Sequence, residues 1–142
     1  MSISENPSRA ARIRYRLLAV AIAVAAALLV WIVATLAGAH LEVTSPLAGT
    51  LTIDVLLTIA AALPAGLAAW GVLALLERLT PRARRIWTIV AVAVLVVSLP
   101  PLALLEANLG TKIVLAIMHV AVGLTLIVLL RRGARGAGEV AA

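Results

Sequence analysis

A short basic segment, Glu77-Arg78-Leu79-Thr80-Pro81-Arg82-Ala83-Arg84-Arg85, separates two long apolar runs in the middle of this chain. Its four arginines are too costly to place in hydrocarbon, and Pro81 disfavours a helix that continues straight through. The segment therefore predicts a turn at one face of a membrane. The apolar runs on either side of it become membrane spans, and their far ends lie at the opposite face.

The composition is that of a membrane protein rather than a soluble domain. The 142 residues are 64% hydrophobic and have a mean hydropathy of +1.17, whereas a soluble domain is about 45 to 50% apolar. The chain has no cysteine. This excludes disulfides, thiolate metal sites, iron–sulfur clusters and cysteine nucleophiles.

The distribution of positive charge predicts the topology. Eleven of the twelve Lys and Arg residues lie before the first apolar run, in the central turn or after the last run. The positive-inside rule places all three groups, and therefore both termini, in the cytoplasm. This pattern argues for contact with anionic lipid headgroups and against nucleic acid as the partner. The arginines expected at the headgroups are Arg14, Arg16, Arg78, Arg82, Arg84, Arg85, Arg131 and Arg132.

Four apolar runs reach the length of about 20 residues that crosses a bilayer. The spans are expected at residues 17–38, 51–76, 86–105 and 111–130, between a basic segment 1–16 and a flexible tail 131–142. The first run is longer than the core of about 7 to 15 residues in a secretory signal peptide, so we interpret it as a span. The predicted fold is all-α, a transmembrane four-helix bundle. Pro100-Pro101 predicts a bent or frayed end of the third span, and loops are expected at 40–49 and 106–110.

Ionisable side chains within the spans are candidates for function, because each costs about 2.5 to 3.5 kcal/mol near the bilayer centre. Thr50, Asp54 and Thr58 recur every four residues, which predicts a polar stripe on one face of the second helix. Lys112, His119 and Gly123 share a face of the fourth. We expect these faces to form one outward-facing polar pocket. Its candidate members are Asp54, Thr58, Lys112, His119 and Glu106.

The same residues also have plainer interpretations. Asp54 is equally compatible with a solvated helix start capped by Thr50 or Thr52, and His119 with a structural hydrogen bond to a neighbouring helix. Asp54 and His119 are too few ligands for a metal site, and no cofactor is expected. Ser98 completes the residue types of a hydrolase triad, but the spacing does not support one and no other catalytic motif is present. The chain is not expected to be an enzyme.

Other residues predict helix contacts. Pro64, Gly66 and Gly71 in the second span and Gly123 in the fourth allow another helix to approach closely. Trp87 is expected in the interfacial aromatic belt. Glu77, beside the arginines of the turn, is expected in a surface ion pair of little energetic value.

Several segments together resemble a known family. They are Ala68-Ala69-Trp70-Gly71-Val72-Leu73-Ala74-Leu75-Leu76-Glu77-Arg78, Ala83-Arg84-Arg85-Ile86-Trp87-Thr88, Thr111-Lys112 and Ala116-Ile117-Met118-His119. From about Arg12 to Arg131 the chain resembles a family of small four-span actinobacterial membrane proteins that form a domain of unknown function. The resemblance implies the four-span fold and an actinobacterial plasma membrane. It implies no activity, ligand or catalytic residue.

Two functions are compatible with this sequence. The first is a non-enzymatic membrane protein that works through helix contacts, as a homo-oligomer or as an accessory subunit of a membrane-protein partner. The second is a small transporter or ligand-binding protein with an outward-facing polar pocket around Asp54 and His119.

Overall fold

The computed structural model describes residues 9–45 and 49–133, which form a bundle of long helices with one small hairpin. Its elements are α1 (Arg9–Leu36), β1 (Glu42–Ser45), β2 (Gly49–Thr52), α2 (Val55–Leu79), α3 (Ala83–Ser98), α4 (Pro100–Ala103) and α5 (Leu109–Gly133). Within the described residues, four helices are long and apolar enough to cross a membrane, α3 and α4 counting together as one. The predicted four-helix transmembrane bundle is confirmed. Residues 9–16 of the basic segment belong to α1, while residues 1–8 and residues 134–142 of the expected tail lie outside the described residues.

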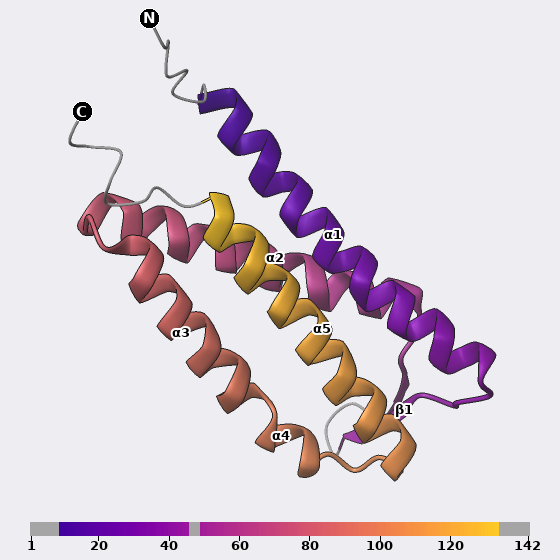
Figure 1. Ribbon diagram of the computed structural model, residues 1–142. Coiled ribbons are helices and arrows are strands. Elements are labelled where there is room, and N and C mark those ends of the chain that lie inside the picture. The colour runs from indigo at the N-terminus through magenta and orange to yellow at the C-terminus, as the bar shows by residue number, and fades with distance from the viewer. Residues whose placement is uncertain (1–8, 46–48, 134–142) are drawn as a thin grey trace, which may run out of the picture.

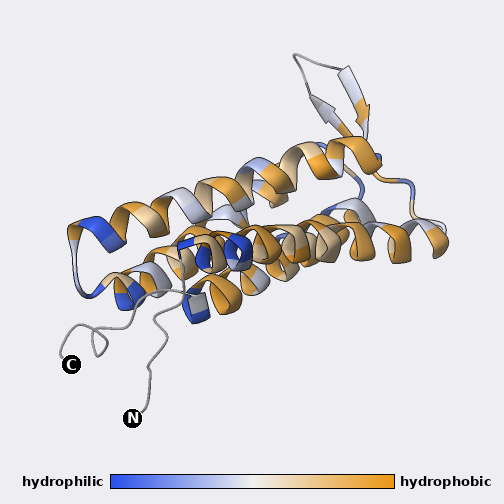
Figure 2. Ribbon diagram, turned by 90° about the horizontal axis from the view of Figure 1, so that it is seen from above, coloured by the Kyte–Doolittle hydropathy of each residue, from blue (hydrophilic) through white to orange (hydrophobic). Residues whose placement is uncertain are grey.

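The four long helices are packed unequally. In Figure 1, α1, α5 and α3 lie side by side and α2 runs behind them. The most extensive contacts join α1 to α5 and α1 to α2, whereas α3 makes fewer contacts with α2 and α5. Figure 2 shows hydrophobic residues along the length of the helices and the hairpin projecting from one end of the bundle. The side of the bundle that contains α1 is therefore the more closely packed.

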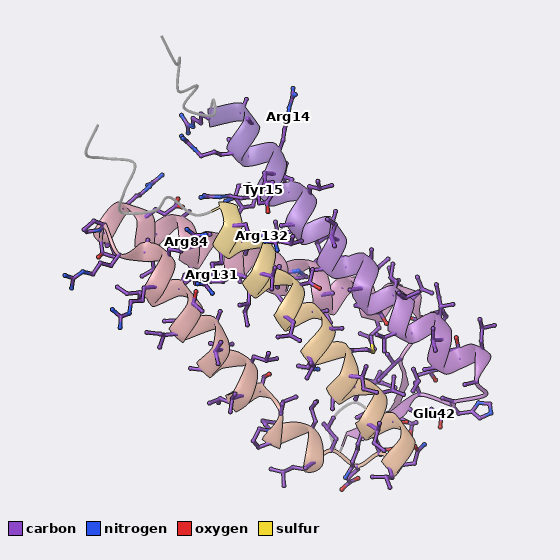
Figure 3. All side chains as sticks on the ribbon, in the orientation of Figure 1. Arg14, Tyr15, Glu42, Arg84, Arg131 and Arg132 are labelled. Carbon is purple, nitrogen blue, oxygen red and sulfur yellow. The ribbon has the colours of Figure 1, made fainter. Side chains whose placement is uncertain are left out.

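The two ends of the bundle differ in charge. Figure 3 places Arg14, Arg84, Arg131 and Arg132 toward one end, which we call the arginine end, and Glu42 at the other, which we call the hairpin end. Seven of the eight arginines expected at lipid headgroups are exposed. The separation agrees with two opposite membrane faces. The assignment of the arginine end to the cytoplasm stays a prediction.

Arg16 is the exception among these arginines. One of its terminal nitrogens, Nη2, donates to both carboxylate oxygens of Glu77 at 2.6 and 2.7 Å, and the two side chains are only 8% and 11% exposed. The predicted surface ion pair at Glu77 and the predicted headgroup contact of Arg16 are therefore wrong. The pair instead joins α1 to α2 inside the bundle, because Arg16 lies on the buried face of α1, whereas Arg14 is exposed.

Small residues of α1 let neighbouring helices come close. Ala19, Ala23 and Ala27 recur every four residues and are at most 1% exposed, so this face of α1 is completely covered. Ala19 and Ala23 pack in one cluster with Leu73 of α2 and with residues of α3 and α5. That cluster includes Trp87, which is 3% exposed, so its predicted place in an interfacial belt is wrong.

The hairpin end contains structure where a loop was expected. β1 and β2 pair antiparallel, with Glu42 opposite Thr52, and Thr44 forms an isolated bridge to Glu106. β-branched residues favour this extended pairing, and Gly49 adopts φ +70°, a conformation that glycine tolerates. Thr50 therefore lies on a strand, and the predicted helical stripe of Thr50, Asp54 and Thr58 is wrong.

The third span ends as predicted. α3 stops at Ser98, and Pro100-Pro101 open the short helix α4, whose residues precede the turn into α5. A proline lacks the backbone N–H of a continuing helix, so the break falls at this point. The third span is consequently not a single straight helix, because it is broken near its hairpin end.

Candidate functional site: a groove between α2, α3 and α5

A hollow of about 640 Å³ in the described part of the chain is lined chiefly by α2, α3 and α5. Several of its lining residues are exposed, among them Leu57 of α2 and Val94 of α3. The hollow is therefore an open groove rather than a sealed void. We call it the α2–α3 groove, after the two helices that form its walls.

Alanines create the space along α2. Ala61, Ala65 and Ala68 follow at intervals of four and three residues, so they lie on one helical face, and all three line the groove. Val90 and Val94 of α3 form part of the facing wall. Because the alanine side chains are a single methyl group, α2 and α3 leave a volume between them that neither helix fills.

The groove is elongated along the bundle. Its lining on α3 extends from Trp87 to Ser98, which are separated by about 16 Å at 1.5 Å per helical residue. Ser98 and Thr58 lie toward the hairpin end of their helices, and His119 lies in the interior of α5. The half of the groove nearer the arginine end is lined by apolar groups such as Ala68 and Val72.

Three polar side chains line the groove, and each bonds to its own helix. The Thr58 hydroxyl donates to the Asp54 carbonyl at 2.8 Å, and the Ser98 hydroxyl donates to the Leu95 carbonyl at 2.7 Å. The His119 Nδ1 lies 2.9 Å from the Leu115 carbonyl. A carbonyl oxygen only accepts, so Nδ1 carries the hydrogen and Nε2 of the neutral ring is an acceptor. The expected hydrogen bond from His119 to a neighbouring helix is therefore wrong.

Trp87 is the fourth lining residue with a polar atom. Its indole nitrogen Nε1 is buried and has no hydrogen-bond partner within the described residues. A buried donor without a partner costs about 1 to 3 kcal/mol. Because this atom is buried while the groove is open, the ring meets the groove through its carbon atoms.

Most of the polar pocket expected from the sequence is not formed. Asp54 is exposed and caps α2, accepting from the Leu57 amide at 2.7 Å, so it is itself the cap that was expected from Thr50 or Thr52. Lys112 donates through Nζ to the Ala103 carbonyl at 2.8 Å.

Glu106 is the remaining expected member of the polar pocket, and its backbone carbonyl accepts from the Thr44 amide at 2.8 Å. Neither Glu106, Lys112 nor Asp54 lines the groove. Of the five expected members, only Thr58 and His119 do so. The predicted approach of Asp54 to His119 is not supported, because one is a solvent-exposed cap and the other faces the groove.

The predicted helix-packing residues divide into two groups. A Cβ atom on Gly66 would lie 2.8 Å from Val20 Cγ1, and one on Gly123 would lie 2.7 Å from Leu95 Cδ1. Both glycines therefore serve contacts inside this bundle. A Cβ on Gly71 would meet nothing within 4 Å, and Pro64 is exposed. Only these two residues of the set remain open to a partner.

Sequence reasoning missed the groove because it searched for polar residues. The available signal was the spacing of Ala61, Ala65 and Ala68, but α1 has a similar row that is buried.

Among residues 9–45 and 49–133, no group of three His, Cys, Asp or Glu side chains is placed to hold a metal ion. The arrangement suits an apolar molecule with a small polar part.

Comparison with known proteins places the chain in a family. No curated protein and no solved structure matches it. A family of unknown function, DUF6069, matches residues 7–136, which is nearly the whole chain. This four-helix, multi-pass membrane protein therefore belongs to the DUF6069 family.

Proposed function

We propose that this is a non-enzymatic integral membrane protein that binds a lipid-soluble molecule in the α2–α3 groove. The observation that carries the proposal is the groove itself. Its volume of about 640 Å³ falls within the range of roughly 300 to 1,000 Å³ that is usual for small-molecule sites. Such sites combine an apolar lining with a few polar groups, as Ser98, Thr58 and His119 provide here.

The hydrogen bonds of the groove support binding rather than catalysis. In a hydrolase triad the serine hydroxyl bonds to the histidine, and the histidine bonds to a carboxylate. Here Ser98 donates to a backbone carbonyl, and the His119 Nδ1 bonds to another. Asp54 lies outside the groove as a helix cap. No nucleophile is activated by this arrangement.

The location of the groove favours a ligand that arrives through the membrane. Its walls run along two membrane-spanning helices, from Leu57 to Val72 on α2 and from Trp87 to Ser98 on α3. Exposed residues such as Val94 and Leu57 face the surroundings of these spans. We place the protein in a bacterial plasma membrane with the arginine end in the cytoplasm, following the positive-inside rule. The exposed arginines then contact lipid headgroups, and no nucleic acid is involved.

Native mass spectrometry of the full chain, extracted in mild detergent from its host membrane, tests the binding function. We expect a retained non-protein mass in the wild type and its loss in Ala65→Leu, whose larger side chain fills the groove. The matched control is Ala60→Leu, which adds the same side chain to an exposed position of α2 outside the groove. Equal retention in Ala65→Leu and Ala60→Leu, or no retained mass in the wild type, would contradict the proposal.

A second candidate is the helix-contact function, as a homo-oligomer or an accessory subunit. The open position at Gly71 favours it, because small residues let transmembrane helices approach closely. The same spectra record subunit number and any co-purifying protein. This function predicts an assembly that Gly71→Leu dissociates and that Ala65→Leu leaves intact.

A further inference from the structure

The three polar side chains of the α2–α3 groove have a property in common. Each has used its hydrogen on a carbonyl of its own helix, at distances of 2.8 Å for Thr58, 2.7 Å for Ser98 and 2.9 Å for His119. What each can still offer is a lone pair, on a hydroxyl oxygen or on the imidazole Nε2. The groove is therefore a surface of hydrogen-bond acceptors.

No lining side chain of the described residues supplies an accessible donor to balance these acceptors. Trp87 Nε1 is covered and does not face the open space. Lys112 is the cationic residue nearest to His119 in the sequence. Its Nζ donates to the Ala103 carbonyl, and it is not part of the lining. A ligand whose only polar group is an acceptor, such as an ether or an ester, would leave its oxygen unpaired beside other acceptors.

Charge narrows the ligand class further. An ammonium group is also a donor, but an isolated charge in an apolar site is strongly disfavoured unless an opposite charge compensates it. Asp54 is the acidic residue closest in sequence to Thr58, and it points to the α2 cap instead of the groove. No carboxylate lines the groove. A neutral donor, which in a lipid is a hydroxyl group, satisfies both conditions.

We infer that the α2–α3 groove selects neutral lipids that carry a hydroxyl group, and that His119 is the residue that recognises this hydroxyl. The inference rests on the proposed binding function. The ligand hydroxyl donates to His119 Nε2 in the hairpin half of the groove. Its hydrocarbon chain lies along Ala65 and Ala68 toward Trp87, over the length of about 16 Å given by eleven helical steps of 1.5 Å on α3.

Two matched probes test the inference on the full chain in detergent micelles. Tritiated 1-hexadecanol has the hydroxyl donor, and hexadecyl methyl ether has the same chain and oxygen without the donor. We expect hexadecanol to bind roughly three- to tenfold more tightly, the difference made by about one neutral hydrogen bond. In His119→Phe, which keeps a ring but removes the acceptor, the affinity for hexadecanol should fall to that for the ether.

The outcomes separate the ligand class from the binding function. Equal affinities for the alcohol and the ether in the wild type, with both abolished by Ala65→Leu and kept by Ala60→Leu, would leave the groove as a binding site and overturn the inference. An unchanged preference in His119→Phe would overturn the role of His119. Binding of neither probe would overturn the inference, while the native mass spectra decide the binding function separately. The comparison of the two probes on the wild type needs no variant, so it holds even if His119→Phe does not fold.

Discussion

Two rows of alanine in this protein have opposite surroundings. Ala19, Ala23 and Ala27 of α1 are at most 1% exposed, covered by the neighbouring helices. Ala61 and Ala65 of α2 have the same side chain and a similar spacing, yet they are exposed in the wall of a groove. Small residues permit close packing, but they produce it only where a second helix follows the row along its length. Where the second helix diverges, the same residues leave an open groove.

The closely packed side, which contains α1, also holds the buried ion pair described above. Among residues 9–45 and 49–133, no comparable pair joins α3 to α2. Arg16 and Glu77 connect α1 to α2 at the arginine end. α3, in contrast, contacts α2 less extensively and is broken at Pro100. The helices are thus closely packed and joined by an ion pair around α1, whereas a groove remains between α2 and α3.

The largest expected effect is on the closely packed side. Glu77→Ala should lower the free energy of unfolding by about 3 to 5 kcal/mol, because it leaves the buried Arg16 guanidinium without this carboxylate. Unfolding by SDS in mixed micelles measures the change. The double variant Arg16→Met with Glu77→Leu removes both charges and should recover most of the loss. If Glu77→Ala changes the free energy of unfolding by less than about 0.5 kcal/mol, the ion pair does not stabilise the contact between α1 and α2.

The next effect compares two glycines of α2 that face different neighbours. Gly66→Ala should destabilise the protein by about 1 to 3 kcal/mol, because the new Cβ meets the branched, stiff side chain of Val20 at 2.8 Å. Gly71→Ala should be neutral or stabilise by up to about 1 kcal/mol, since alanine favours a helix and nothing lies within 4 Å. The same unfolding assay measures both. Changes of equal sign and size would show that the two faces are packed alike.

Gly123 provides an intermediate case on α5. A Cβ there would lie 2.7 Å from Cδ1 of Leu95, which is the end of a flexible side chain that can rotate away. Gly123→Ala should therefore cost less than Gly66→Ala. The larger destabilisation by Gly66→Ala than by Gly123→Ala serves as the internal control for the comparison of Gly66 with Gly71.

The smallest effect concerns the end of α2 beside the groove. Asp54→Ala should cost about 0.5 to 2 kcal/mol, because it removes the acceptor for the Leu57 amide, whereas Asp54→Asn keeps the cap. Neither variant should alter hexadecanol affinity, since Asp54 does not line the groove. Unfolding and binding are measured on the same samples. Loss of hexadecanol affinity in Asp54→Asn would show that Asp54 takes part in binding after all.

Part of the candidate site was visible in the sequence and part was not. His119 and Asp54 were identified because an ionisable group within a span is costly. Thr58 and Lys112 were grouped with them by helical spacing, but Asp54 is the cap that precedes α2, and Lys112 reaches the Ala103 carbonyl. Spacing places residues on one face of a helix. It does not say which other helix that face meets.

The amino-acid sequence by itself determined the spans, their number and the gathering of arginine at one end, because apolar length and charge act locally. It also determined the break at Pro100-Pro101, which follows from the missing backbone donor of proline. The tertiary structure alone decided that Arg16 and Glu77 are buried together, that Trp87 lies in the core, and that the alanines of α1 are covered while those of α2 line a groove. These outcomes depend on which helices are neighbours and how closely they run, and residues far apart in the chain set both.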